Sequence, residues 1–273
     1  MPFATVGHER IFYASHRKAG PGASVLVLVH GAGGNHQLWG LAVRHLPSAT
    51  TYAVDLPGHA RSGGTSCRSV DDYAEFVVNF LNALGLEHAV IAGHSMGGAI
   101  AMTMALNHPQ SVAGLVLVGT GARLRVLPAI LEGTLSDFQK TIELICGYAY
   151  SSRAPRELVR QGQQQMLQVA PQIVHDDFAA CNAFDVIPCV EQIHCPTVAI
   201  CGTEDTLTPP KYSQYLADKI AGAQLELIEG AGHMVMIEKP DLVAKCIESA
   251  LARWTEQSSD ASIRARTWMA QRG

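Results

Sequence analysis

The chain has 273 residues, a formal net charge of −4 at pH 7, 48% hydrophobic residues and 16% charged residues. This composition supplies a buried core and excludes a disordered chain, and the slight negative charge argues against nucleic acid as the main partner. The apolar runs are far shorter than the roughly 20 residues of a membrane-spanning helix, so we expect no membrane partner.

Short apolar runs of strand character recur along the chain. They are ERIFYAS, VLVLV, TYAVD, AVIAG, GLVLVG, TVAIC and QLELI, at residues 9–15, 25–29, 51–55, 89–93, 114–119, 197–201 and 224–228. Continuous apolar runs are typical of parallel strands covered on both faces. Helical patterns lie between them, for example at residues 71–85, and Thr208 before two prolines predicts a helix N-cap. This alternation predicts an α/β fold with a mainly parallel sheet.

One long interval, residues 122–193, contains no clear strand. Its apolar residues recur at helical spacing, and a single crossover needs only about a dozen residues. We therefore expect a helical cap inserted at residues 122–193 of a core domain formed by residues 1–121 and 194–273. An ordinary, long set of crossover helices is the alternative. Within this interval the acidic pair Asp176–Asp177 predicts a helix N-cap.

The seven cysteines are odd in number and form no CxxC pair. This pattern argues against a disulfide framework and against a zinc site. His8 and Glu9 could open an HExxH zinc motif, but Phe12 occupies the position of the second histidine. We expect no metal and no cofactor. The reduced cysteines and the absence of a targeting pattern at the N-terminus predict a cytoplasmic protein.

The stretch GHSMGG, residues 93–98, stands between an apolar run and a helix-like run. The pattern G-x-S-x-G between a strand and a helix is typical of a nucleophile elbow, in which small flanking residues allow a sharp turn. We therefore predict that Ser95 is a nucleophile raised above the carboxyl edge of the sheet. The N–H of Met96, at the start of the helix, is predicted to be an oxyanion donor. A plain serine-containing turn is the alternative.

A serine nucleophile needs a base beside it and an acid that orients the base. Among twelve histidines, His233 directly follows the last predicted strand and opens onto the same side of the sheet as Ser95. His59 follows another strand and is the second candidate. Asp205, in the loop after TVAIC, is the predicted acid, with Glu204 as its rival. The resulting chain order of serine, acid and histidine is the order that the elbow motif predicts.

The loop HGAGGNHQLW follows the strand VLVLV. Its glycines allow the backbone to approach a ligand closely. We predict that the N–H of Ala32 is the second oxyanion donor, with Gly31 and Gly33 shaping the loop. The loop has neither a GxGxxG pattern nor a Gly-Lys-Ser/Thr ending, so phosphate binding is excluded.

The motifs HGAGG, DLPGHARS, GHSMGG, CGTEDTLTPP and GAGHM follow one another in the order found in the α/β-hydrolase superfamily, which the chain resembles over nearly its whole length. The resemblance implies a central, mostly parallel sheet of about eight strands, helices on both faces and a helical cap over the site. Ala60 departs from the glycine that relatives often have, and we expect only a small change in turn geometry. A serine nucleophile excludes relatives that use aspartate, such as haloalkane dehalogenases and epoxide hydrolases.

Within the family the chain resembles small carboxylesterases, enol-lactonases and pimeloyl-carrier-protein methyl ester esterases. The leading hypothesis is a serine hydrolase that cleaves small-molecule carboxylic esters with small or medium apolar acyl or aryl groups through an acyl-enzyme. The alternatives are a lactonase, a thioesterase or a C–C bond hydrolase on the same triad, and a ligand-binding receptor on a hydrolase scaffold. The oligomeric state, monomer or homodimer, stays open. The predicted pocket residues are His94, Leu127, Leu131, Phe138 and Met234.

Overall fold

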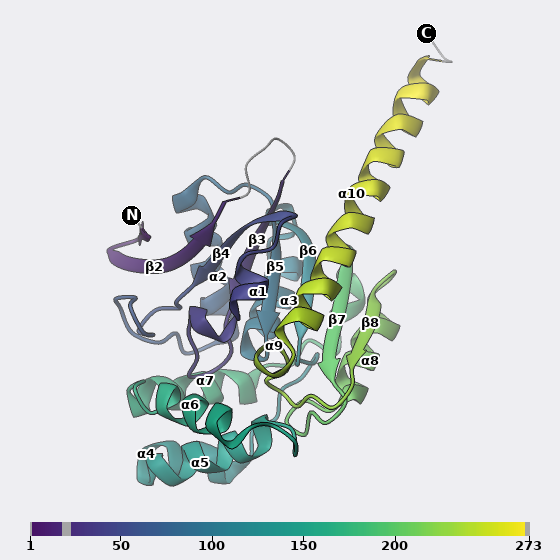
Figure 1. The fold of residues 1–273 in the computed structure, drawn as a ribbon. Helices are drawn as coiled ribbons and strands as arrows, with labels where there is room; N and C mark the ends of the chain where they lie inside the picture. The colour runs from purple at the N-terminus through teal and green to yellow at the C-terminus, as the bar shows by residue number, and fades with distance from the viewer. Residues whose placement is uncertain (1, 18–22, 271–273) are drawn as a thin grey trace.

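Eight strands form one sheet at the centre of the computed structural model, which describes residues 2–17 and 23–270 (Figure 1). The strands are β1 (Phe3–Val6), β2 (Glu9–His16), β3 (Ser24–Val29), β4 (Ala49–Val54), β5 (Ala89–His94), β6 (Val112–Val118), β7 (Thr197–Gly202) and β8 (Gln224–Ile228). Their order across the sheet is β1-β2-β4-β3-β5-β6-β7-β8. The pairs β1–β2 and β2–β4 are antiparallel and the others are parallel. This architecture confirms the predicted α/β-hydrolase fold.

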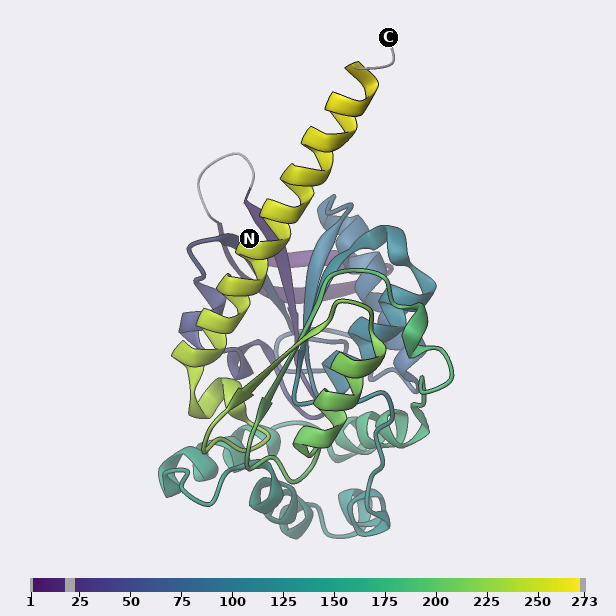
Figure 2. The same cartoon turned by 90° about the vertical axis from the view of Figure 1, so that its right-hand side faces the viewer.

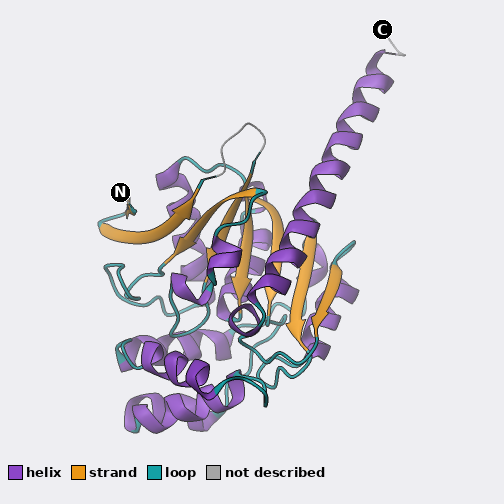
Figure 3. Ribbon diagram, in the orientation of Figure 1, coloured by secondary structure: helices purple, strands orange, loops and turns teal. Residues whose placement is uncertain are grey.

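Helices cover both faces of the sheet, as Figures 2 and 3 show. They are α1 (Leu41–Arg44), α2 (Val70–Leu84), α3 (Met96–Asn107), α4 (Pro128–Ser136), α5 (Phe138–Ala149), α6 (Arg156–Met166), α7 (Pro171–Ala183), α8 (Pro210–Lys219), α9 (Val235–Glu238) and α10 (Pro240–Ala270), with short 3-10 helices at His36–Leu38, Pro109–Ser111 and Val190–Gln192. One buried apolar cluster packs α2, α3 and α8 on one face. A second cluster packs α1 and α10 on the other face. The sheet is therefore buried on both sides, as its continuous apolar strands require.

Helix α2 illustrates how local chemistry sets the bounds of an element. The Ser69 hydroxyl accepts the Asp72 N–H at 3.0 Å and caps the N-terminus of the helix. Tyr73, Val77 and other apolar residues at helical spacing face the core. Gly85 ends the helix in the left-handed region, with φ of 65°. These are the start and stop signals that place a helix over this segment of the sequence.

Helix α10 begins at Pro240, as proline at a first helical position predicts. It packs against β7 and β8 and then extends away from the body of the molecule (Figure 1). The polar C-terminal residues are compatible by composition with a helix end or with a loose tail. In the structure they are helical as far as Ala270, and residues 271–273 lie outside the described residues.

Helices α4 to α7, which we call the cap helices, lie between β6 and β7 in the chain and at the carboxyl end of the parallel strands in space (Figures 1 and 3). Two N-cap predictions are wrong. Asp176 and Asp177 lie in the middle of α7, whose N-cap is Ala170. Thr208 does not cap α8, whose N-cap is Pro209. In both cases the polar side chain bonds to a group that is distant in the sequence.

The turn that contains Ala60 has a left-handed geometry that favours glycine. Ala60 is exposed and has φ of 44°, in the left-handed region. A Cβ in that region costs about 1 kcal/mol. The chain therefore tolerates local strain at an exposed position of this turn.

Candidate active site

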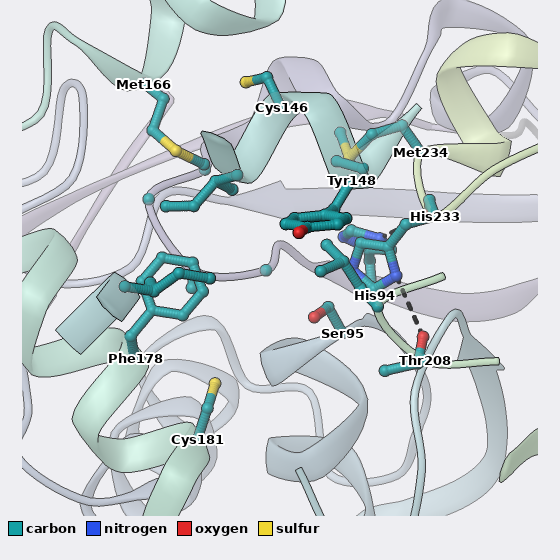
Figure 4. Close-up of a pocket in the computed structure, with 18 of the residues that line it drawn as sticks. His94, Ser95, Cys146, Tyr148, Met166, Phe178, Cys181, Thr208, His233 and Met234 are labelled. Carbon is teal, nitrogen blue, oxygen red and sulfur yellow. Dashed lines mark hydrogen bonds between the residues drawn. The ribbon is translucent and has the colours of Figure 1, made fainter. Parts of the chain in front are cut away.

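Ser95 stands at a strained turn between β5 and α3. Its backbone has φ of 53° and ψ of −114°, which a residue other than glycine adopts only when the surroundings enforce it. The flanking glycines supply that enforcement, because a Cβ on Gly93 would lie 2.0 Å from the Gly97 carbonyl oxygen. A Cβ on Gly97 would lie 2.2 Å from the Val29 carbonyl oxygen. The close packing of strand, turn and neighbouring strand lifts Ser95, whose hydroxyl points into a cavity (Figure 4).

His233 and Asp205 meet beside Ser95 on the loops that follow β8 and β7. His233 Nδ1 lies 3.0 Å from Asp205 Oδ2, and both side chains are almost fully buried. Because a carboxylate can only accept, Nδ1 carries a proton and donates it to Oδ2. Burial alone would raise the pKa of Asp205, but His233 and the Thr208 N–H and hydroxyl donors lower it below its ordinary value. The acid therefore stays ionised.

Thr208 is a third partner at this junction that the sequence analysis missed. Its hydroxyl donates to Asp205 Oδ2 at 2.8 Å and lies 3.0 Å from His233 Nδ1 (Figure 4). The N–H groups of Leu207 and Thr208 donate to Asp205 Oδ1 at 3.0 and 2.8 Å. The carboxylate is thus held in one orientation before it contacts the imidazole. A local signal existed in the sequence, because an aspartate two or three residues before free N–H groups forms such a turn.

His94 contacts both the backbone and the ring of His233. Its Nε2 donates to the His233 carbonyl oxygen at 3.1 Å, and the two ring centroids are 4.7 Å apart. Burial, reinforced by the nearby His233, holds the pKa of His94 well below its ordinary value. His94 is therefore neutral and acts as a fixed donor to the backbone of the loop.

The two rival candidates for the base and the acid lie elsewhere. His59 is fully buried, and its Nε2 lies 2.8 Å from Asp177 of α7. Glu204 is turned outward and accepts from the N–H and hydroxyl of Ser152 at 3.0 and 2.8 Å. Neither side chain faces His233 or Ser95, because each belongs to a contact between the sheet loops and the segment at residues 122–193.

The glycine-rich loop at residues 30–35, which we call the oxyanion loop, lies against Ser95. A Cβ on Gly31 would lie 3.2 Å from Ser95 Cβ. The N–H groups of Ala32 and Met96 take part in none of the hydrogen bonds found among the described residues. Met96 is the first residue of α3, where N–H groups lack helical partners. Both predicted oxyanion donors are therefore available beside the predicted nucleophile.

The cavity that Ser95 enters has a volume of about 310 Å³. Its wall is mostly apolar and includes His94, Leu127, Ile130, Tyr148, Met166, Phe178 and Met234. Of the predicted pocket residues, His94, Leu127 and Met234 lie in this wall, whereas Leu131 and Phe138 do not. Ile130 already faces the cavity, so Leu131, about 100° further round α4, points elsewhere. Phe138 packs instead against the buried apolar cluster that includes Ile142 and Ile145 of α5.

Asp177 is the second group that the sequence analysis misjudged. It lies on the buried face of α7 with Val174 and Cys181, three residues before and four residues after it. A carboxylate on the apolar face of a helix needs a partner, and this periodicity was the signal that could have found it.

No group of histidine, cysteine, aspartate or glutamate side chains suited to a metal ion occurs in the part of the chain that the structure describes. Within the same residues, none of the helices combines the length and the apolar character needed to cross a bilayer. All seven cysteines are free thiols.

A family model described as alpha/beta hydrolase fold matches residues 24–240, well over half of the chain. The chain belongs to this family. It is therefore an α/β-hydrolase enzyme, as the order of its motifs predicted.

Similar α/β-hydrolases carry names that describe ester cleavage. A Xenopus laevis monoacylglycerol lipase, abhd6-A, is 27% identical over 92% of this chain and 82% of its own length. A pimeloyl-[acyl-carrier protein] methyl ester esterase from Serratia marcescens is 28% identical over 85% of this chain and 96% of its own length. The solved structure of a thermophilic esterase is 33% identical, has a TM-score of 0.81 and covers 92% of this chain and 97% of that chain.

Proposed function

We propose that this α/β-hydrolase is a serine carboxylesterase that hydrolyses small-molecule esters with apolar acyl or aryl groups. The observation that carries the proposal is the strained Ser95, which opens into an apolar cavity beside a histidine whose Nδ1 is bound by a buried carboxylate. The names of the similar proteins, which describe ester cleavage, support the same chemistry.

The proposed reaction begins with attack of Ser95 Oγ on the ester carbonyl carbon. His233 Nε2 accepts the hydroxyl proton, and the N–H groups of Ala32 and Met96 bind the oxyanion of the tetrahedral intermediate. Collapse of the intermediate breaks the C–O bond, and His233 returns the proton to the leaving alcohol. A water molecule, deprotonated by His233, then attacks the acyl-enzyme. The bond between the acyl carbon and Ser95 Oγ breaks, His233 returns the proton to Oγ, and the acid is released. Asp205 keeps Nδ1 protonated and stabilises the imidazolium.

The lining of the cavity supports the substrate class. Arg125 is the one arginine or lysine side chain among the described lining residues, and it lies in the segment that leads from β6 to α4. Its guanidinium is engaged by the Asn182 carbonyl oxygen at 3.1 Å. An uncharged acyl group thus meets mostly apolar walls, whereas a carboxylate on an acyl chain that lies away from Arg125 would lose its hydration without a partner.

A fluorophosphonate probe and a series of p-nitrophenyl esters test this function. The wild type should be labelled at Ser95 and should hydrolyse the butyrate ester through many turnovers, well in preference to the hemisuccinate. Ser95→Ala should lose labelling and about 10⁴-fold or more of the turnover rate. Ser136→Ala, an exposed serine of α4, is the matched control and should behave as the wild type. Retained turnover in the Ser95 variant would overturn the assignment, and wild-type release of at most a few product molecules would indicate a receptor.

A further inference from the structure

One buried carboxylate of the cap helices reaches the oxyanion loop. Asp177 is fully buried, and its side-chain hydrogen bonds go to groups outside the cap helices. Its Oδ2 accepts the Gly33 N–H at 2.8 Å and lies 2.8 Å from His59 Nε2, and its Oδ1 accepts the Tyr73 hydroxyl at 2.5 Å. A buried carboxylate needs such partners. Asp177 therefore obtains these hydrogen bonds only when α7 packs against the body of the protein.

The partner of Asp177 carries a positive charge. Both ring nitrogens of His59 face acceptors, with Nδ1 at 3.0 Å from the Pro57 carbonyl oxygen and Nε2 at 2.8 Å from the carboxylate. Two acceptors require two ring protons, so His59 is an imidazolium. Burial would lower the pKa of His59, but Asp177 outweighs burial and raises it. The charge pair keeps Asp177 ionised and therefore keeps it a strong acceptor for the Gly33 N–H.

Gly33 follows Ala32, the proposed oxyanion donor, and it receives two further contacts from the cap helices. A Cβ on Gly33 would lie 3.1 Å from Met166 Cγ of α6 and 3.4 Å from Val174 Cγ2 of α7. Gly33 also has φ of 62°, a conformation that suits glycine. Side chains of two cap helices therefore fill the space beside the residue next to the oxyanion donor, and Asp177 holds its N–H.

The other end of the oxyanion loop is held without the cap helices. His30 Nε2 accepts the Leu56 N–H at 3.0 Å, so Nδ1 carries the proton and donates to the Gly31 carbonyl oxygen at 2.8 Å. The Gly34 N–H donates to the same carbonyl oxygen at 3.1 Å. Ala32 therefore lies between Gly31, which is held by His30 and Gly34, and Gly33, which is held by Asp177 of α7.

We propose that Asp177 is a positioning residue that couples the seating of α7 to the oxyanion hole, because its bond to Gly33 fixes the direction of the Ala32 N–H. The inference rests on the proposed function of Ala32. The neighbouring Phe178 lines the cavity, so an acyl group packed against α7 presses on the same turn of helix that holds the loop. A substrate that packs well against α7 is therefore expected to have a higher kcat as well as a lower KM.

Asp177→Ala and Asp177→Asn test the coupling with a p-nitrophenyl ester. In Asp177→Ala we expect kcat to fall about 10- to 100-fold with KM changed less than about threefold, because a misplaced donor acts on the transition state. A trifluoromethyl ketone, whose hydrate-like adduct mimics the oxyanion, should bind more weakly by a similar factor. The neutral amide oxygen of Asp177→Asn can still accept the Gly33 N–H, but more weakly than a carboxylate, so this variant should recover part of kcat and stay at least about threefold below the wild type. If the alanine variant does not fold, the asparagine variant carries the test through a threefold or larger loss of kcat.

Two control variants separate positioning from general support of the cap helices. Asp176 also joins α7 to the body, through the Ser66 hydroxyl at 2.7 Å, but it does not touch the oxyanion loop. Arg123 joins the segment before the cap helices to Asp185, just after α7, through an ion pair, and it does not touch the oxyanion loop either. Asp176→Asn and Arg123→Ala should keep kcat within about twofold even where they lower Tm. An unchanged kcat in the folded Asp177 variants, or an equal loss in the controls, would refute the coupling.

Hydrogen–deuterium exchange distinguishes failure of this inference from failure of the proposed function. Peptides that cover residues 30–35 should exchange at least about threefold faster in Asp177→Asn than in Asp176→Asn, whether or not the protein hydrolyses esters. Faster exchange of the loop in a protein that shows no esterase turnover would support the contact between Asp177 and Gly33 and would overturn the proposed function. Equal exchange of the loop in both variants would overturn the positioning role.

Discussion

At the scale of single residues, the junction of Asp205 and His233 depends on the Thr208 hydroxyl, to which the sequence analysis gave no part in the site. Thr208 donates to Asp205 Oδ2 and also lies within hydrogen-bond distance of His233 Nδ1. It therefore limits the movement of both side chains, in the way that residues around a catalytic acid orient it. The sequence favoured an N-cap at Thr208 because local patterns report only neighbours along the chain. The contact with His233 spans 25 residues and arises from the sheet order.

Thr208→Val should lower kcat for a p-nitrophenyl ester about tenfold, because a hydrogen bond to a charged group is worth about 1.5–3 kcal/mol and valine keeps the shape of threonine. Thr208→Ser keeps the hydroxyl and serves as the matched control, with kcat within about threefold of the wild type. Steady-state kinetics together with Tm measurements check this. Equal rates for the serine and valine variants would show that the hydroxyl has no part in the reaction.

At the scale of elements, the seven strands of the sequence analysis are all present. The central strands β3, β5, β6 and β7 are buried on both faces and therefore carry continuous apolar runs, whereas β2 and β8 lie nearer the edges of the sheet and are only partly buried. The missed strand, β1, has only four residues at the sheet edge and is half-buried, so its pattern is weak. The cap helices were harder to interpret. Helical spacing identifies a buried stripe, but it does not say whether the stripe faces a cavity, as Ile130 does, or an apolar cluster, as Phe138 does.

The two phenylalanines of the cap helices allow a matched test of which face lines the pocket. Phe178 lies in the wall of the cavity and Phe138 does not. Phe178→Ala should raise the ratio of kcat/KM for the p-nitrophenyl decanoate over the butyrate about tenfold, because the removed ring makes room for further methylenes, each of which contributes about 1 kcal/mol or more in an apolar site. Phe138→Ala should leave the ratio within about twofold while lowering Tm. A similar change in both variants would indicate loosening of the cap helices rather than an enlarged pocket.

At the scale of the whole molecule, buried histidines make stability depend on pH in two directions. His30 and His94 are buried neutral, and burial lowers the pKa of His30 to about 4 and that of His94 well below 6.5. Their contribution is complete above pH 6.5 and is lost as the pH falls, because the unfolded chain then binds more protons. His59 has the opposite effect, since Asp177 raises its pKa against the effect of burial. Its contribution is present below pH 6.5 and is lost as the pH rises through the folded-state pKa.

His30→Gln tests the acid limb of this balance. The pKa of His30 falls from 6.5 to about 4 on folding, so His30 is protonated in the unfolded chain before it is protonated in the folded protein. This difference should lower the free energy of unfolding of the wild type by about 2 kcal/mol between about pH 7 and about pH 4.5. Glutamine cannot take the proton, and the variant, although less stable at neutral pH, should show a curve that is flatter by that amount. Urea titrations at several pH values measure both curves, and the exposed His88→Gln should keep the wild-type slope. Parallel curves for His30→Gln and the wild type would show that His30 is protonated without cost in the folded protein, which would contradict the neutral donor that anchors Gly31 of the oxyanion loop.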